Sequence, residues 1–335
     1  MTLDIIVPHY KEPWSVCKYL FDTLATQRGI LFDHIRVILV NDGDDVLFGD
    51  IGQALMKLSS YPFTVDYIVK EHGGVSAARN EGLDASDADY VMFCDCDDGF
   101  LNNYALHMVF SAMQDGFDLF MANFVEETFD KDGNPNIVTH TEDLTFMHGK
   151  VYNRQFLLDN DLRFDDCLTI HEDGYFNMLV YSTVQKLNAR LKKVGTPIYL
   201  WRWNNNSVVR ADKEDFVLKT YSHVMAARIA ICHKQKDREG FEEFYKASVC
   251  MTVLNSYYDF QKTRYHMAKN TKYLKVAEIA FREFWMEFGK DFCELTNAYV
   301  AEVAQAARAN AVKNGMLLEQ QTLKEFLKHI EYEVK

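Results

Sequence analysis

The chain has 335 residues, 48% of them hydrophobic and 25% charged, a composition typical of a globular protein with one large or two ordinary domains. Its formal net charge of −13 disfavours binding to polyanions such as DNA or to anionic membranes, while leaving room for a local basic patch. No apolar run approaches the ~20 residues that cross a bilayer, and the seven cysteines form no CxxC pair. We therefore expect a soluble, cytoplasmic protein without a membrane span, a zinc site or a disulfide framework.

The first half of the chain alternates strand-like and helix-like segments. Strand-like runs are LDIIVP (3–8), HIRVILVND (34–42), FTVDYIV (63–69) and DYVMFCD (89–95), and helix-like runs are SVCKYLFDTLATQ (15–27) and SAARNEGLDAS (76–86). This alternation predicts an open α/β sheet with helices on both faces, in which ligands bind beyond the carboxyl ends of the strands. Polar residues follow three of these strands, at 8–10, 41–44 and 95–98.

The second half changes character near residue 210. Residues 119–210 are mixed, with a hairpin turn expected at DKDGNP (130–135) and short strands near FMANF (120–124) and PIYLW (197–201). No proline follows Pro197, and apolar residues recur at helical spacing from Lys213 onward. These positions are Val217, Tyr221, Val224, Ala227 and Ile231, then Ala277, Phe281, Phe284 and Phe288, then Leu323, Phe326, Leu327 and Ile330. We predict two domains, at 1–210 and 211–335, the second all-helical and serving acceptor binding or oligomerisation.

Three carboxylates crowd the end of an apolar run in VMFCDCDDGF (91–100). Like charges side by side are unfavourable away from water unless a cation or donor compensates them. The oxygens of Asp95, Asp97 and Asp98 suit a hard divalent ion such as Mg²⁺ or Mn²⁺, which takes its other ligands from phosphate and water. The alternative is a solvated acidic turn, with Asp98 capping a helix that begins near Leu101.

Two further segments have a functional and a purely structural interpretation. In KEHGGVSAARNEG (70–82) a Gly-Gly pair permits an unusual backbone path, Ser76 can cap a helix, and Arg79 and backbone amides can face a diphosphate. The alternative is an ordinary loop and cap. In NDGD (41–44) Asp42 can accept the imide N–H of a uracil ring, or simply form an Asx turn that leaves the sheet.

A second pair of carboxylates stands in HEDGYFN (171–177), just before a helix-like run. A carboxylate near a bound electrophile can take the proton from an incoming hydroxyl, which is typically worth ~10²–10⁴ in rate. Helix N-termini also favour acidic side chains for structural reasons. Glu172 and Asp173 are therefore candidate catalytic residues with a structural alternative.

Taken together and in order, six segments resemble the inverting glycosyltransferases of family 2, which have the GT-A fold. They are IIVPHYKE, VILVNDGDD, HGGVSAARNEG, YVMFCDCDD, HGKVYNRQFL and HEDGYFN, and the resemblance spans about residues 2–210. The helical remainder is outside it.

The resemblance implies a role for each matching position. Asp42 is similar to the carboxylate that reads the nucleotide base, and Asp173 to the general base, with Glu172 beside it. Asp95, Asp97 and Asp98 match the DxD pattern that holds the metal and the donor, with Asn204 as a further metal-ligand candidate. The candidate donor-binding residues are Pro8, Tyr10, Glu12, Asp42, Gly74, Arg79, Asp95, Arg202 and Ser207.

Three positions depart from the family pattern. Asn204 stands where a metal- or phosphate-binding His is frequent, and an amide oxygen is a weaker ligand than a charged group. Asn41 replaces the first of two acidic residues at the end of the second strand. Tyr199 stands where processive members carry Gln or Arg, which, without membrane spans, favours a non-processive enzyme.

The expected function is metal-dependent transfer of a sugar, with Mn²⁺ or Mg²⁺, from a nucleoside diphosphate sugar to a hydroxyl of a glycan or polymer, with inversion. A UDP-sugar is the expected donor. The alternatives are an inactive nucleotide-sugar-binding or interaction protein, and the same chemistry on a modified nucleobase. A dinucleotide-dependent oxidoreductase is disfavoured because no GxGxxG follows the first strand.

The helical region contains one segment with aromatic and basic residues, YYDFQKTRYHMAKNTKY (257–273). Such a mixture can stack on rings and contact phosphates, so Lys262, Arg264 and Lys269 are candidates for acceptor binding. The alternative is a solvated basic helix face. Exposed apolar helix faces also permit self-association into a homo-oligomer.

Overall fold

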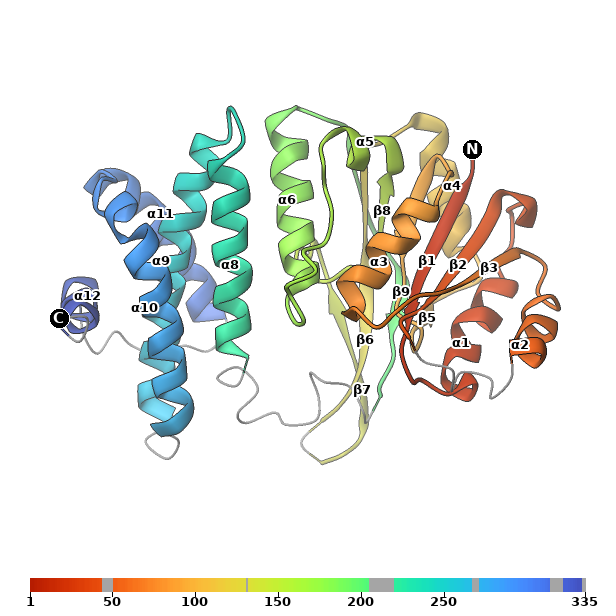
Figure 1. The fold of residues 1–335 in the computed structure, drawn as a ribbon, viewed down its shortest axis with the longest axis horizontal. Helices are drawn as coiled ribbons and strands as arrows, with labels where there is room; N and C mark the ends of the chain where they lie inside the picture. Colours follow the sequence, from red (N-terminus) through yellow and green to blue (C-terminus); the bar gives the residue numbers. More distant parts are fainter. Residues whose placement is uncertain (44–50, 131, 205–219, 267–270, 314–321, 333–335) are drawn as a thin grey trace. The chain divides into compact units, whose positions relative to one another are not determined.

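The computed structural model describes residues 1–43, 51–130, 132–204, 220–266, 271–313 and 322–332. The chain divides into two compact units, Met1–Ser207 and Val208–Lys335. The first unit is built on a mixed sheet and the second consists of helices (Figure 1).

The sheet of the first unit has nine strands among the described residues, in the order β3-β2-β1-β4-β8-β6-β9-β5, with β7 paired to β6. The strands are β1 (Leu3–His9), β2 (Ile35–Asn41), β3 (Thr64–Val69), β4 (Tyr90–Phe93), β5 (Gly99–Phe100), β6 (Leu119–Phe129), β7 (Pro135–His140), β8 (Lys150–Asn153) and β9 (Leu191–Trp201). Strands β1 to β4 pair in parallel, β8 runs antiparallel to β4 and β6, and β9 is parallel to β6. The four strands and the 130–135 hairpin expected from the sequence are present.

Helices cover both faces of this sheet, as predicted. They are α1 (Trp14–Ala25), α2 (Ile51–Leu58), α3 (Gly74–Ala85), α4 (Ala105–Asp115), α5 (Arg154–Asp159) and α6 (Glu172–Lys186), with a 3₁₀ turn at Phe32–His34. Successive strand residues point to opposite faces, so Ile5 and Val7 join Phe21 of α1 and Val109 of α4 in one core. Ile6 faces α3 on the other side, where a Cβ on Gly82 would lie 2.3 Å from the Ile6 side chain. Only glycine permits this close approach.

The parallel strands bring the predicted polar segments to one edge of the sheet. Tyr10 follows β1, Asp42 follows β2, and the turn 95–98 follows β4, each at a carboxyl end. Apolar runs that are buried on both faces dictate this arrangement, because the chain can turn and expose polar groups only where the strands stop.

The second unit contains α8 (Tyr221–Lys236), α9 (Glu242–His266), α10 (Thr271–Cys293), α11 (Asn297–Lys313) and α12 (Leu323–Tyr332). Its core includes Phe281, Phe284 and Phe288 of α10 and Phe326 and Ile330 of α12, at the helical spacing noted in the sequence. The all-helical prediction is confirmed for the described part, and Val217 lies outside it. None of the described helices combines the length and apolarity that spanning a bilayer requires.

Candidate functional site

The acidic turn connects β4 to β5, and its three carboxylates have different surroundings. Asp98 is 1% exposed; its carboxylate accepts hydrogen bonds from the Tyr199 hydroxyl (2.8 Å) and the Arg202 backbone N–H (2.9 Å). The next helix, α4, begins only at Ala105, so the predicted cap near Leu101 is wrong. Asp98 instead ties the turn to β9, because β5 pairs with that strand immediately after the turn.

Asp97 lies on the more open side of the turn. The Asn204 amide donates to the Asp97 carboxylate (2.8 Å), and the Arg202 guanidinium donates to the Asp97 carbonyl (3.3 Å) while it lies 3.9 Å from the Tyr19 ring centroid. Burial and the charge of Asp95 raise the pKa of Asp97 above its usual value, and the Asn204 amide lowers it in part. The mutual repulsion of these crowded carboxylates favours a bound cation, which would offset it.

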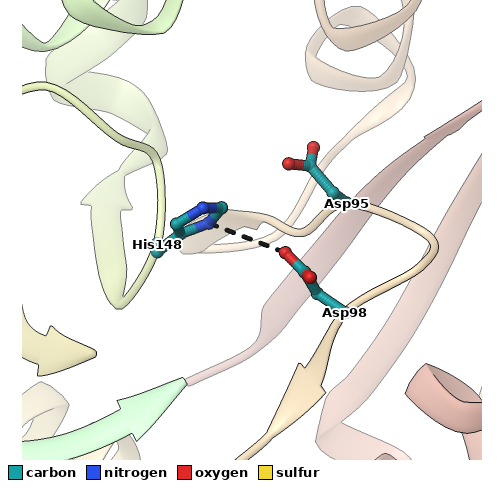
Figure 2. Close-up of side chains that lie close together, drawn as sticks. All are labelled: Asp95, Asp98 and His148. Atoms are coloured by element: carbon teal, nitrogen blue, oxygen red, sulfur yellow. Dashed lines mark ion pairs between the residues drawn. The ribbon is translucent and has the colours of Figure 1, made fainter. Parts of the chain in front are cut away.

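His148 joins Asp95 and Asp98 in a cluster whose possible ligand atoms all lie within 4.8 Å of one another (Figure 2). Its Nδ1 atom is 3.8 Å from Asp98, and its ring stacks against Tyr199 at a centroid distance of 4.7 Å. Burial lowers the pKa of His148 to about 3, so the imidazole is neutral at physiological pH. Sequence reasoning missed this residue, although it lies in the HGKVYNRQFL segment.

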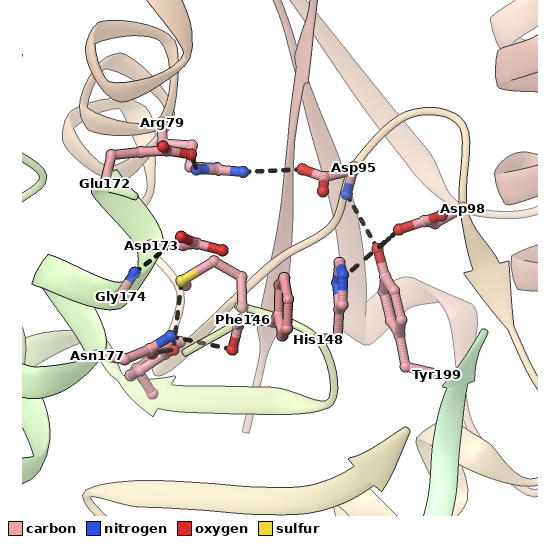
Figure 3. A network of polar contacts seen from close by, with 12 residues as sticks. Arg79, Asp95, Asp98, Phe146, His148, Glu172, Asp173, Gly174, Asn177 and Tyr199 are labelled. Atoms are coloured by element: carbon pink, nitrogen blue, oxygen red, sulfur yellow. Dashed lines mark hydrogen bonds and ion pairs between the residues drawn. The ribbon is translucent and has the colours of Figure 1, made fainter. Parts of the chain in front are cut away.

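Arg79 joins the acidic turn to the start of α6 (Figure 3). Its guanidinium donates to Asp95 (2.8 Å) and to Glu172 (2.8 Å), and the residue is only 4% exposed. Burial disfavours the charge, but the two carboxylates outweigh it and hold the pKa of Arg79 above its usual value. Glu172 therefore forms an ion pair with Arg79. A carboxylate paired in this way is better suited to positioning its neighbours than to accepting a proton.

Asp173 is the second residue of α6, which begins at Glu172 after the N-cap residue His171, whose backbone has a φ of 66°. Its carboxylate accepts the N–H of Gly174 (2.8 Å) and points toward the region that Asp95 and His148 also face (Figure 3). Burial raises the pKa of Asp173 to about 7, with a further contribution from Glu172 and an opposing one from Arg79. A carboxylate with a pKa near the working pH can act as a general base.

Asn177 and Lys150, which the sequence did not single out, fix α6 against β8. The Asn177 amide donates to the carbonyls of Thr145 (3.1 Å) and Phe146 (3.0 Å), and its oxygen accepts from the Tyr152 hydroxyl (2.7 Å). Lys150 also donates to the Phe146 carbonyl, and burial lowers its pKa to about 8. The first turns of α6, including Asp173, therefore have a rigid support.

Asp42 lies under the Gly-Gly loop that precedes α3. Its carboxylate accepts from the N–H of Gly73 (2.9 Å), the N–H of Gly74 (2.8 Å) and the ammonium of Lys70 (2.9 Å). Burial alone would raise the pKa of Asp42, but these three donors lower it below its usual value. The predicted cap at Ser76 is wrong, because the N-cap residue of α3 is Gly73. Ser76 lies inside the helix, and its hydroxyl donates to the Leu168 carbonyl.

The remaining donor-binding candidates lie around the end of β1. Pro8 is buried within the strand, Tyr10 is partly exposed, and Glu12 accepts the backbone N–H of Tyr10 (2.8 Å). Ser207 lies outside the described residues. The side chains of residues 261–274, with those of Lys262, Arg264 and Lys269, are outside them as well.

Residues 4–170 match the family model described as glycosyl transferase family 2. The chain belongs to glycosyl transferase family 2. This glycosyltransferase is 25% identical to EpsJ of Bacillus subtilis (strain 168), named as an uncharacterized glycosyltransferase, over 276 residues that cover 76% of this chain and 74% of EpsJ. It is 35% identical over 99 residues to the minor teichoic acid biosynthesis protein GgaB of the same organism, covering 28% of this chain and 10% of GgaB.

Solved structures share the fold of this family 2 glycosyltransferase. S. aureus TarS 1–349 in complex with UDP-GlcNAc superposes with a TM-score of 0.63 at 19% identity, covering 94% of this chain and 89% of that one. The mannosyltransferase PcManGT from Pyrobaculum calidifontis, in complex with GDP-Man and Mn²⁺, gives a TM-score of 0.50 at 12% identity, covering 98% and 84%. The predicted GT-A fold is thus confirmed.

Proposed function

We propose that this family 2 glycosyltransferase transfers a sugar from a UDP-sugar to a hydroxyl of a glycan or polymer, with inversion, with a divalent metal and without processivity. The observation that carries the proposal is the Arg79 bridge from Asp95 to Glu172, because it ties the acidic turn to the residue directly before Asp173 at the start of α6. The solved TarS complex with UDP-GlcNAc and the resemblance to GgaB support a UDP donor and a polymeric acceptor.

The acidic turn fits a divalent ion. Asp97 and Asp95 are both partly exposed, whereas Asp98 is enclosed by Tyr199 and the Arg202 backbone. An ion that also binds a diphosphate needs open coordination positions, so Asp95, Asp97 and the Asn204 amide oxygen are the proposed ligands. Mn²⁺ or Mg²⁺ held there would neutralise negative charge on the departing diphosphate.

Asp98 and Arg202 then serve to hold the turn. Asp98 fastens it to Tyr199 of β9, and Arg202 supports the Asp97 carbonyl from the face of Tyr19. Preorganised side chains of this kind avoid the cost of reorganisation during the reaction.

The end of β1 and the Gly-Gly loop are the proposed nucleoside site. Tyr10 offers a partly exposed aromatic face, Pro8 precedes it on β1, and Asp42 is a carboxylate that can accept an imide N–H. The backbone N–H of Gly74 donates a hydrogen bond to the Asp42 carboxylate. Gly74 therefore contributes to donor binding by orienting that carboxylate.

Asp173 is the proposed general base. It takes the proton of the acceptor hydroxyl as that oxygen attacks the anomeric carbon from the face opposite the leaving diphosphate, which inverts the configuration. Glu172 and Arg79 position it, and Asn177 holds the helix that carries it. The role of the helical unit in acceptor binding or self-association stays a prediction.

Two proteins test this function: the wild type and Asp173→Asn. With Mn²⁺ and a panel of UDP-sugars and saccharide acceptors, the wild type is expected to release UDP and give a product of inverted anomeric configuration by NMR. The Asn variant should lose about 10²–10⁴ in kcat and keep its UDP affinity. Near-normal transfer by the variant, or a product of retained configuration, would refute the assignment.

A further inference from the structure

We propose that His72 occupies the place of the nucleobase when no donor is bound, and that the base must displace it to enter. The inference rests on the proposed function, since it assumes a nucleotide at Tyr10 and Asp42. It concerns a residue on the Gly-Gly loop that the catalytic network does not use.

The first observation is a stack between two rings. The imidazole of His72 lies 4.3 Å from the Tyr10 ring, centroid to centroid, at an interplanar angle of 18°. This is the parallel arrangement that a flat nucleobase adopts on an aromatic side chain.

The second observation is a polar contact on the edge of the same imidazole. Nδ1 of His72 lies 2.8 Å from the Asp42 carboxylate and 3.1 Å from the Asp42 carbonyl. With its proton on Nδ1, the ring donates to Asp42 as the imide N–H of uracil would. His72 thus combines a face on Tyr10 with an N–H on Asp42, the two contacts proposed for the base.

The third observation is that displacement of His72 leaves no buried charge without a partner. Its side chain is 57% exposed, while the Asp42 carboxylate beneath it is 3% exposed. When the His72 side chain rotates away, Asp42 keeps its hydrogen bonds from Lys70, Gly73 and Gly74. The buried Asp42 carboxylate therefore remains paired.

The backbone at His72 packs closely against Gly43, whereas the His72 side chain is 57% exposed. A Cβ on Gly43, whose φ is 82°, would lie only 2.6 Å from the His72 backbone nitrogen, so the two loops are in close contact. Displacement therefore proceeds by rotation of the side chain.

Occupancy by His72 lowers the apparent affinity for any ligand that carries a base. The measured Kd is the intrinsic Kd divided by the fraction of molecules in which the site is open. A hydrogen bond to a carboxylate together with a ring stack is sufficient to keep most molecules closed. Removing the imidazole should therefore tighten UDP binding and leave binding of a ligand without a base unchanged.

Isothermal titration calorimetry of the full chain, with UDP and with inorganic pyrophosphate in the presence of Mg²⁺, tests this. We expect His72→Ala to bind UDP about tenfold more tightly than the wild type and pyrophosphate with equal affinity. Tyr10→Ala should bind UDP more weakly. The matched control is His107→Ala, which removes an exposed histidine of α4 that contacts the Tyr104 ring, and it should bind UDP as the wild type does.

Weaker UDP binding by His72→Ala would overturn the inference, because His72 would then contribute to the bound complex. Unchanged binding would also overturn it, because His72 would then have no effect on the base. Equal tightening for UDP and pyrophosphate would also overturn it. Absence of UDP binding in every variant would refute the proposed function itself. As a direct readout, the imidazole NMR signal of His72 should lose the ring-current shift from Tyr10 when UDP is added, and a shift that persists in the complex contradicts displacement.

Discussion

The bridge from Arg79 to Glu172 can be tested with a double-mutant cycle of Arg79→Met, Glu172→Gln and the combined variant. Each Arg79 hydrogen bond is 2.8 Å long and lies in a site where Arg79 is 4% exposed. Arg79→Met leaves Asp95 and Glu172 without their shared cation, so we expect it to lose about 3–5 kcal/mol of unfolding free energy. Glu172→Gln should lose about 1.5–3 kcal/mol, the worth of a charge-assisted hydrogen bond.

The combined variant should lose about 2 kcal/mol less than the sum of the single losses, because the two side chains share one interaction. Urea unfolding followed by tryptophan fluorescence suits the measurement, since three of the four tryptophans, Trp14, Trp201 and Trp203, belong to the first unit. The control cycle pairs Glu172→Gln with Arg36→Met, which bonds Asp4 and Asp87 instead and should be additive within about 0.5 kcal/mol. If the Arg79 cycle is equally additive, the bridge contributes nothing and the reasoning is refuted.

Two more predictions concern Asp173 and His148. Because burial raises the pKa of Asp173 to about 7 and the base acts in its ionised form, kcat/KM should fall about tenfold per pH unit below about 7 and level off above it; a profile flat down to pH 5 would contradict this. His148→Phe keeps the stack on Tyr199 and removes the imidazole nitrogens, so Mn²⁺-assisted UDP affinity should stay within about threefold of the wild type. A larger loss of UDP affinity in calorimetry would indicate instead that the ion binds at the Asp95, Asp98 and His148 cluster.

The sequence predicts the parallel half of the sheet well, because β1, β2 and β4 are apolar runs that end in polar residues. It also brings Tyr10, Asp42 and the acidic turn to one edge, since all three follow carboxyl ends of parallel strands. The helical second unit follows from the 3.6-residue spacing of its phenylalanines.

The errors at Asp98 and Ser76 share a physical cause. The sequence permits a capping role for both residues, and capping depends on residues only a few positions away. In the structure Asp98 bonds Tyr199 and Ser76 bonds Leu168, partners about a hundred residues along the chain. Contacts between residues so far apart in the chain produce no pattern in a single sequence from which they could be predicted.

Arg79 and His148 show the same limit within the site. Arg79 was expected at a diphosphate from its place on a helix, yet its closest carboxylates are Asp95 and Glu172. His148 gains its role only because the residues around β8 and the end of β9 fold beside the acidic turn. The only indication in the sequence is that His148 opens the HGKVYNRQFL segment, and its position in the chain does not connect it to Asp98.

The central claim is that the acidic turn holds a cation that binds the nucleotide diphosphate. Calorimetry of UDP with and without Mn²⁺, on the wild type and on Asp97→Ala, tests it most directly. We expect Mn²⁺ to strengthen UDP binding by the wild type at least about tenfold and to have no effect on Asp97→Ala. Equal UDP affinity with and without Mn²⁺ in the wild type, or full Mn²⁺ assistance in Asp97→Ala, would contradict it.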